Sequence, residues 1–186
     1  RIVAGKWRSR LLPVADVEGL RPTSERVRET LFNWLAPVID GARCLDLFAG
    51  TGALGLEALS RGAAQVDLVE CAATAASQLR ENVRLLEAAG ATVHQADAFE
   101  FIRQRGSAQP CDIVFLDPPF ADARYEELCR LLDERGWLAP GALIYIEQDR
   151  SEPLPDLPVG WRVRKEKTAS NVRYSLIETV TRESSQ

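Results

Sequence analysis

From residue 43 onward, short apolar runs alternate with longer stretches that have helical periodicity. The strand-like runs are Cys44–Phe48, Gln65–Glu70, Thr92–Gln95, Ile113–Asp117 and Leu143–Glu147. The helix-like stretches between them cover residues 53–61, 72–89, 98–105 and 122–135. Strands separated by helices form βαβ crossovers. The alternation therefore predicts an α/β domain whose parallel sheet is covered on both faces.

The two ends of the chain depart from this alternation. Residues 1–22 are rich in turn-forming residues and are expected to be extended. After Thr23, a candidate N-cap, apolar residues at helical spacing predict an amphipathic helix over residues 24–38. Trp161–Lys167 and Tyr174–Val180 alternate as strands do, which predicts a C-terminal antiparallel hairpin.

Length and composition fit a single soluble domain. A chain of 186 residues, with 46% hydrophobic and 27% charged residues, can bury a sizeable core. No apolar run approaches the roughly 18 residues of a membrane span. The four cysteines form no C-x-x-C pair and there is one histidine, so we expect neither disulfides nor a metal site. We expect a basic extension over residues 1–22, one domain over residues 23–181, a monomer and a cytoplasmic location.

A glycine-rich segment follows the first strand. Gly50, Gly52 and Gly55 match G-x-G-x-x-G, and Glu70 ends the next strand, where an acid commonly binds ribose hydroxyls. This much fits NAD and S-adenosylmethionine (SAM) equally. Asp46 favours SAM, because a carboxylate four residues before the first glycine suits a cationic amino-acid portion better than a diphosphate.

Asp97 follows the third strand and has two interpretations. Its carboxylate can accept a hydrogen bond from an adenine amino group, or it can be the N-cap of the next helix. Asp46, Glu70 and Asp97 close three consecutive strands, so they should meet at the edge where open α/β sheets bind ligands.

The fourth strand ends in Asp117-Pro118-Pro119-Phe120. The Asp117 side chain and the Pro118 carbonyl can both accept hydrogen bonds from an exocyclic amine of a nucleic-acid base. Phe120 can stack on that base, which is worth roughly 1–3 kcal/mol. The motif predicts methyl transfer to an amino nitrogen without a metal, by positioning. A rigid strand-ending turn without chemistry is the alternative.

Basic residues are concentrated at the two ends of a chain whose net charge is −4. Seven Arg and Lys residues stand against three acids in residues 1–28, and a second basic cluster lies in residues 162–173. The N-terminal cluster suits phosphate contacts, although a solvated charged arm is also possible. The predicted RNA contacts are Lys6, Arg8, Arg10, Arg21, Thr23, Arg26 and Arg28.

These segments resemble known families. DLFAGTGALGLEAL resembles the SAM-binding loop of class I methyltransferases, and DPPF resembles the signature of amino-nitrogen methyltransferases. Arg1–Leu12 and Arg21–Leu35 resemble the bacterial RsmD family, which methylates N2 of a guanine in 16S ribosomal RNA. The resemblance covers about residues 1–180. It implies a Rossmann-like fold: a seven-stranded, mainly parallel sheet that ends in an antiparallel hairpin.

The resemblance also assigns roles to residues. Asp46, Gly50 and Gly52 would hold the methionine part of SAM, Glu70 its ribose and Asp97 its adenine. Residues 117–120 would receive the guanine, with Phe120 where many relatives have Tyr. The predicted cofactor contacts are Asp46, Phe48, Ala49, Gly50, Thr51, Gly52, Glu70, Cys71, Asp97, Ala98 and Asp117.

The implied reaction takes place on 16S rRNA within a small ribosomal subunit or its assembly intermediate. It releases S-adenosylhomocysteine and uses no metal. Three alternatives stay open at this point. They are an adenine-N6 or cytosine-N4 methyltransferase on DNA or RNA, an NAD-binding oxidoreductase, and a non-catalytic RNA-binding module.

Overall fold

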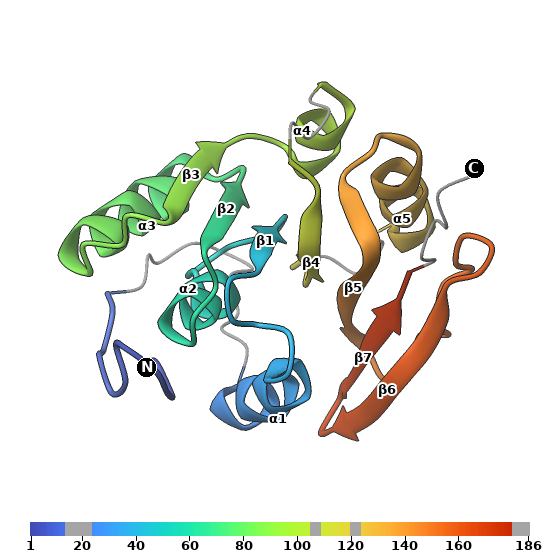
Figure 1. Ribbon diagram of the computed structural model, residues 1–186, viewed down its shortest axis with the longest axis horizontal. Helices are drawn as coiled ribbons and strands as arrows, with labels where there is room; N and C mark the ends of the chain where they lie inside the picture. Colours follow the sequence, from blue (N-terminus) through green and yellow to red (C-terminus); the bar gives the residue numbers. More distant parts are fainter. Residues whose placement is uncertain (14–23, 105–108, 120–123, 180–186) are drawn as a thin grey trace.

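The computed structural model describes residues 1–13, 24–104, 109–119 and 124–179, and their strands form one sheet in the order β3-β2-β1-β4-β5-β7-β6 (Figure 1). The strands are β1 Arg43–Asp46, β2 Gln65–Glu70, β3 Ala91–Gln95, β4 Cys111–Leu116, β5 Leu138–Asp149, β6 Arg162–Ala169 and β7 Val172–Glu178. The helices are α1 Glu25–Leu35, α2 Ala53–Ser60, α3 Ala73–Leu85, α4 Ala98–Gln104 and α5 Tyr125–Glu134. Within these ranges, none of the helices combines the length and the apolar character that a membrane span requires.

Strands β1 to β5 are parallel, and β7 is antiparallel between β5 and β6. The predicted seven-stranded, mainly parallel sheet with a C-terminal hairpin is therefore confirmed. The hairpin is longer than its sequence pattern indicates, because Ala169 pairs with Val172. Only Ser170 and Asn171 remain for the turn, so the expected loop over residues 168–173 is wrong. Ser170 has a φ of 54°, which closes this tight turn.

Helices cover both faces of the sheet. Helices α1 and α2 lie on one side of it and α4 and α5 on the other (Figure 1). On the first side, Phe32 of α1 packs on Phe115 of β4, with ring centroids 6.0 Å apart. On the other side, Ile102 of α4 and Leu128 of α5 are buried against Val114 of the same strand. Strand β4 is thus buried on both faces, as its continuous apolar run indicates.

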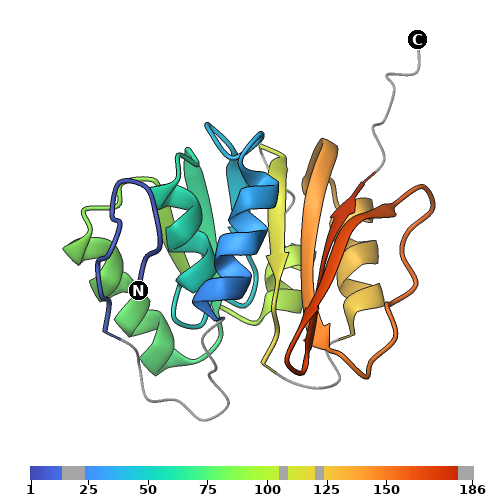
Figure 2. The same cartoon turned by 90° about the horizontal axis from the view of Figure 1, so that it is seen from below.

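The crossovers fix which helix ends lie near which end of the sheet. We call the end at which β1 to β5 finish the carboxyl edge and the opposite end the amino edge. Helix α1 leads into β1, so its first turns lie at the carboxyl edge (Figure 2). Strand β6 runs parallel to β5, because both are antiparallel to β7. The hairpin turn at Ser170–Asn171 therefore also lies at the carboxyl edge.

Helix α1 is shorter than its sequence pattern predicts. It is capped by Ser24, whose hydroxyl accepts a hydrogen bond from the Val27 amide at 3.2 Å, so the prediction of Thr23 as the N-cap is wrong. The helix ends at Leu35 rather than at residue 38. Pro37 has no N–H to donate to the preceding turn, which explains the early end.

The N-terminal segment folds back on itself. The Ile2 amide donates to the Arg10 carbonyl at 3.0 Å, and the Ser9 amide donates to the Ile2 carbonyl at 2.8 Å. Ile2 and Trp7 are buried in the same core as α1 and α2. The expected extended conformation is therefore wrong for residues 4–9, which form turns. Burial of two large apolar side chains favours this compact arrangement.

Candidate active site

The glycine-rich loop joins β1 to α2 in a tight turn. Gly50 and Gly52 have φ values of 54° and 83°, in the left-handed region that favours glycine. A Cβ on Gly52 would lie 2.7 Å from the Leu79 side chain, and one on Gly55 would lie 2.3 Å from the Leu68 side chain. These glycines therefore let α2 pack closely on α3 and β2. Of the other predicted loop contacts, Phe48 and Thr51 are half-buried and Ala49 is buried.

Asp46 ends β1 beneath this loop and is only 1% exposed. Its Oδ2 accepts a hydrogen bond from the Gly55 amide at 3.2 Å, whereas Oδ1 has no regular hydrogen bond among the described residues. Burial raises the pKa of Asp46 to about 7, and the charge of Asp117 adds to this effect. The amides of Gly55 and Phe48 oppose it. A buried carboxylate without a cation is costly, so a positively charged ligand group nearby would stabilise it.

Glu70 ends β2 and holds the glycine-rich loop in place. Its Oε2 accepts a hydrogen bond from the Gly50 amide at 2.8 Å, and its Oε1 accepts one from the Ala72 amide at 3.0 Å. Each carboxylate oxygen can accept a second hydrogen bond, so Glu70 can still bind a ligand hydroxyl. The neighbouring Cys71 is exposed, with its Sγ 3.9 Å from Glu70 Oε1. Cys71 differs in this from Cys44, Cys111 and Cys129, which are buried.

Asp97 lies two residues beyond β3 at the same edge. Its Oδ1 accepts a hydrogen bond from the Glu100 amide at 3.1 Å, which confirms the N-cap interpretation. The capped helix, α4, begins at Ala98, which is buried. Asp97 itself is exposed, so a role in binding adenine stays a prediction compatible with the cap.

Asp117, Pro118 and Pro119 follow β4 directly, and Phe120 lies outside the described residues. Asp117 is half-buried, Pro118 is buried and Pro119 is exposed. The charge of Asp117 raises the pKa of Asp46 and contributes to raising those of Tyr125 and Tyr145, so it faces groups on β1, α5 and β5. Asp117 therefore lies near Asp46, at the edge where the sequence predicts that Asp46, Glu70 and Asp97 meet.

Two tyrosines near Asp117 were not predicted. Tyr125 of α5 donates a hydrogen bond to the Glu147 carbonyl of β5. Tyr145 of β5 is fully buried, and burial raises its pKa well above the ordinary value. In the sequence, both follow ordinary apolar periodicity, and only the fold brings them to Asp117.

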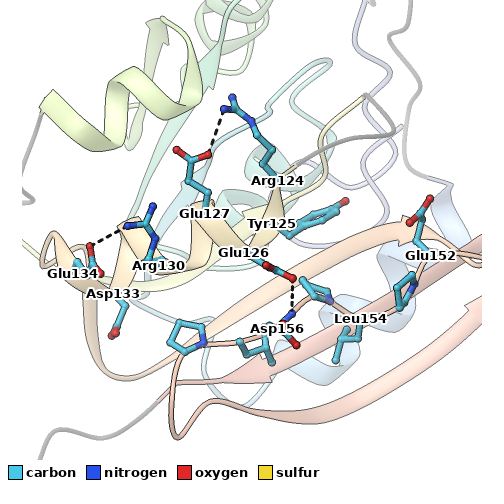
Figure 3. A pocket seen from close by; sticks show the side chains of 14 residues that line it. Arg124, Tyr125, Glu126, Glu127, Arg130, Asp133, Glu134, Glu152, Leu154 and Asp156 are labelled. Carbon is cyan, nitrogen blue, oxygen red and sulfur yellow. Dashed lines mark hydrogen bonds and ion pairs between the residues drawn. The ribbon is translucent and has the colours of Figure 1, made fainter.

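A cavity of about 850 Å³ lies between α5 and residues 152–158 (Figure 3). Six carboxylates and two guanidinium groups line it: Glu126, Glu127, Asp133, Glu134, Glu152 and Asp156, with Arg124 and Arg130. Both guanidiniums are paired with glutamates of α5. The excess of negative charge makes this cavity a poor site for a phosphate-bearing ligand.

The predicted RNA contacts of the N-terminal segment lie away from the carboxyl edge. Lys6 and Trp7 donate backbone hydrogen bonds to Ser60, at 2.8 Å to its carbonyl and 3.0 Å to its hydroxyl. Ser60 is the last residue of α2, which places the exposed Lys6, Arg8 and Arg10 near the amino edge.

Arg28 has a structural environment. It is 4% exposed, its Nη2 donates to the Arg1 carbonyl at 2.8 Å, and its Nη1 lies 3.8 Å from Glu57 Oε1. Burial lowers the pKa of Arg28, although the charge of Glu57 opposes this effect. The prediction of an RNA contact is wrong for Arg28, because its guanidinium is used inside the fold. Arg26 is exposed, whereas Arg21 and Thr23 lie outside the described residues.

Comparison with known proteins places the chain in a family. A family model described as conserved hypothetical protein 95 matches residues 1–178. Ribosomal RNA small subunit methyltransferase D of Escherichia coli (strain K12) is 52% identical over 178 residues, which are 96% of this chain and 89% of that protein. The protein of the same name from Haemophilus influenzae is 47% identical over 180 residues, covering 96% of this chain and 93% of that protein.

Solved structures agree with the sequence comparison. The putative methyltransferase yhhF from Escherichia coli superposes with a TM-score of 0.89 and 48% identity, and the match covers 98% of both chains. The chain therefore belongs to the RsmD family, that of the ribosomal RNA small subunit methyltransferase D proteins.

Proposed function

We propose that the protein transfers a methyl group from SAM to the exocyclic N2 of a guanine in 16S rRNA. The observation that carries this proposal is the meeting of Asp46, Glu70 and Asp117 at one edge of the sheet. The similarity to small subunit methyltransferase D over 96% of the chain supports the choice of substrate.

The residues at this edge fit SAM. Asp46 is a buried carboxylate without a cationic partner among the described residues, and SAM carries both an ammonium and a sulfonium group. Because Asp46 is nearly inaccessible, it acts on the ligand through its charge rather than by direct contact. Glu70 would bind the ribose hydroxyls and Asp97 the adenine amine. When bound, SAM supplies an electrophilic methyl group.

Asp117 and the Pro118 carbonyl would hold the target amine. The lone pair of an exocyclic amine is delocalised into the ring, which makes the nitrogen a weak nucleophile. Two acceptors of hydrogen bonds from its N–H groups favour a pyramidal nitrogen whose lone pair points away from these acceptors. Asp117 would also take the proton that the methylated nitrogen loses. The rate enhancement would come mainly from this positioning.

The identity of the product tests the proposal. Small ribosomal subunits or deproteinised 16S rRNA that lack the modification are treated with isotope-labelled SAM, and the nucleosides are then analysed. We expect label in N2-methylguanosine. Label in N6-methyladenosine or N4-methylcytidine would contradict the assignment of the base, and a protein that does not bind SAM would contradict the whole proposal.

Action on this substrate also implies a cytoplasmic enzyme, and we expect it to be a monomer.

A further inference from the structure

A groove separates the first turns of α1 from the β6–β7 hairpin. Its volume is about 620 Å³, and its lining residues are Arg26 and Thr30 of α1 with Glu166, Lys167, Thr168, Ala169 and Tyr174 of the hairpin. Both walls belong to the carboxyl edge, because α1 begins there and the hairpin turns there (Figures 1 and 2). The groove therefore opens at the same edge of the sheet as Asp117.

Aromatic packing holds the two walls together. The rings of Trp34 and Tyr174 stack with centroids 5.4 Å apart and an interplanar angle of 26°. Tyr174 is buried, so it joins α1 to the hairpin at the bottom of the groove. The groove is thus preformed in the folded protein, as binding sites usually are.

The charges in the groove suit an anionic ligand. Arg26 and Lys167 are exposed and form no ion pair with any other described residue. The carboxylate of Glu166 lies 3.7 Å from Arg173, which offsets its charge. Further along β6, Arg162 and Arg164 both contact Glu178, and Lys165 lines a different cavity, together with Pro37 and Asp112. Arg26 and Lys167 are therefore the cations that this groove offers to a ligand.

Strand register gives the separation between the groove and Asp117. Lys167 pairs with Tyr174, and Tyr174 pairs with Glu147. Leu116 pairs with Ile146, so Asp117 follows at the level of Glu147. Three strand spacings of about 4.8 Å separate Asp117 from Lys167, or roughly 14 Å. A few nucleotides of one RNA strand span this distance.

We propose that this groove binds the ribose–phosphate backbone of the nucleotides next to the target base, with Arg26 and Lys167 contacting phosphates. The inference rests on the proposed function, because it takes RNA as the substrate. It explains how a base can be presented to Asp117: the flanking strand is held by charge alone, which requires no particular sequence.

The double variant Arg26→Ala/Lys167→Ala tests the groove. Its affinity for deproteinised 16S rRNA should fall on the order of tenfold, and the slope of log affinity against log salt should decrease by about 0.7 for each lost contact to single-stranded RNA. The KM for small ribosomal subunits should rise by a similar factor, with kcat and SAM affinity near those of the wild type. The charge-preserving variant Arg26→Lys/Lys167→Arg should retain affinity. Arg84→Ala/Arg130→Ala removes two exposed cations elsewhere and is the matched control.

The outcomes separate a failure of the groove inference from a failure of the proposed function. A folded double variant with wild-type RNA affinity and salt slope would overturn the inference. A loss confined to intact subunits, with unchanged affinity for deproteinised RNA, would also overturn it, because the groove would then contact a ribosomal protein. If the wild type forms no N2-methylguanosine but the double variant still loses RNA affinity, the groove stands and the proposed function fails.

Discussion

Glu57 of α2 and Asp46 at the end of β1 are both buried carboxylates, and their surroundings differ. Glu57 has a fully buried side chain, and it lies 3.8 Å from Arg28 and 3.0 Å from Arg61. Its oxygens also accept hydrogen bonds from the amides of Val3 and Ala4. Asp46 is buried to a similar extent, but its charged neighbours are other carboxylates. The carboxylate of Glu57 is paired with cations inside the folded chain, whereas the part of the chain that the structure describes places no cation beside Asp46, and a ligand can supply one. The first should govern stability and the second binding.

The largest effect is expected from Glu57→Ala. It leaves two guanidiniums without their partner and removes the acceptor for the N-terminal segment. Breaking a buried ion pair in this way costs about 3–5 kcal/mol, at the lower end here because Arg61 is 14% exposed. Urea unfolding measures the loss. Glu81→Ala removes an exposed partner of Arg84 and should leave the free energy of unfolding nearly unchanged, because solvent screens exposed ion pairs. Equal losses in the two variants would contradict the difference drawn between buried and exposed pairs.

Asp117→Ala should act on activity and not on stability. It removes the carboxylate proposed to hold the target amine, so single-turnover methyl transfer should fall at least about 100-fold, or about 2.7 kcal/mol. SAM should still bind, because Glu70 and the glycine-rich loop are unchanged. Asp117→Asn keeps a carbonyl acceptor and should retain more activity than Ala.

Thermal melts with and without SAM provide the control for Asp117. If the Asp-Pro-Pro turn is only structural, both variants should lose stability and activity together. A well-folded, SAM-binding Asp117→Ala protein with near wild-type turnover would overturn the proposed mechanism.

The features that the sequence predicts well are those encoded by neighbouring residues. The glycine-rich turn, the Asp97 cap and the end of β4 before Asp117 each depend on a few consecutive residues. That Asp46, Glu70 and Asp97 lie at one edge was also predictable, because parallel strands that alternate with helices must end at one edge. The hydrophobic periodicity that predicts these strands also predicts the helices between them, and this alternation predicts the fold class.

The features that the sequence did not predict depend on contacts between distant segments. Arg28 appears in a basic run, and only its packing on Glu57 of α2 shows that it is buried. Ser24 and Thr23 are adjacent residues of similar capping ability, so local preference could not choose between them. The groove needs α1 beside the hairpin, a contact made through Trp34 and Tyr174 from opposite ends of the chain.

The pKa of Asp46 predicts how SAM binding depends on pH. With a pKa of about 7 in the free protein, Asp46 is partly protonated near neutrality. A cationic ligand favours the ionised form, so SAM binding should release protons and strengthen as pH rises from 6 to 8. The limit is tenfold per pH unit, or about 1.4 kcal/mol. Calorimetry in buffers with different ionisation enthalpies measures the proton release.

In the absence of ligand, the raised pKa of Asp46 makes folding stability decrease as pH rises, whereas SAM binding strengthens. The unfolded chain loses the Asp46 proton near pH 3.8, well before the folded protein does. The contribution of Asp46 to folding stability is therefore present below pH 3.8 and is lost as pH rises to about 7. Asp46→Asn should abolish both the proton release and this pH dependence. Unchanged proton release in a folded Asp46→Asn protein would assign it to another group.

The smallest effect is expected from the N-terminal cations. Lys6, Arg8 and Arg10 are exposed, but the bonds from Lys6 and Trp7 to Ser60 hold them near the amino edge, away from Asp117. Replacing all three by Ala should raise the KM for small ribosomal subunits and flatten its salt dependence. The reason is that binding releases fewer counterions from the RNA when fewer phosphate contacts form. SAM affinity should not change.

Although three charges are removed, the increase in KM should be smaller than that of the Arg26→Ala/Lys167→Ala variant, whose two cations lie at the edge where the base reacts. A larger increase from the N-terminal variant would show that the substrate extends over the outer face of α2, and that this surface contributes more to binding than the groove does.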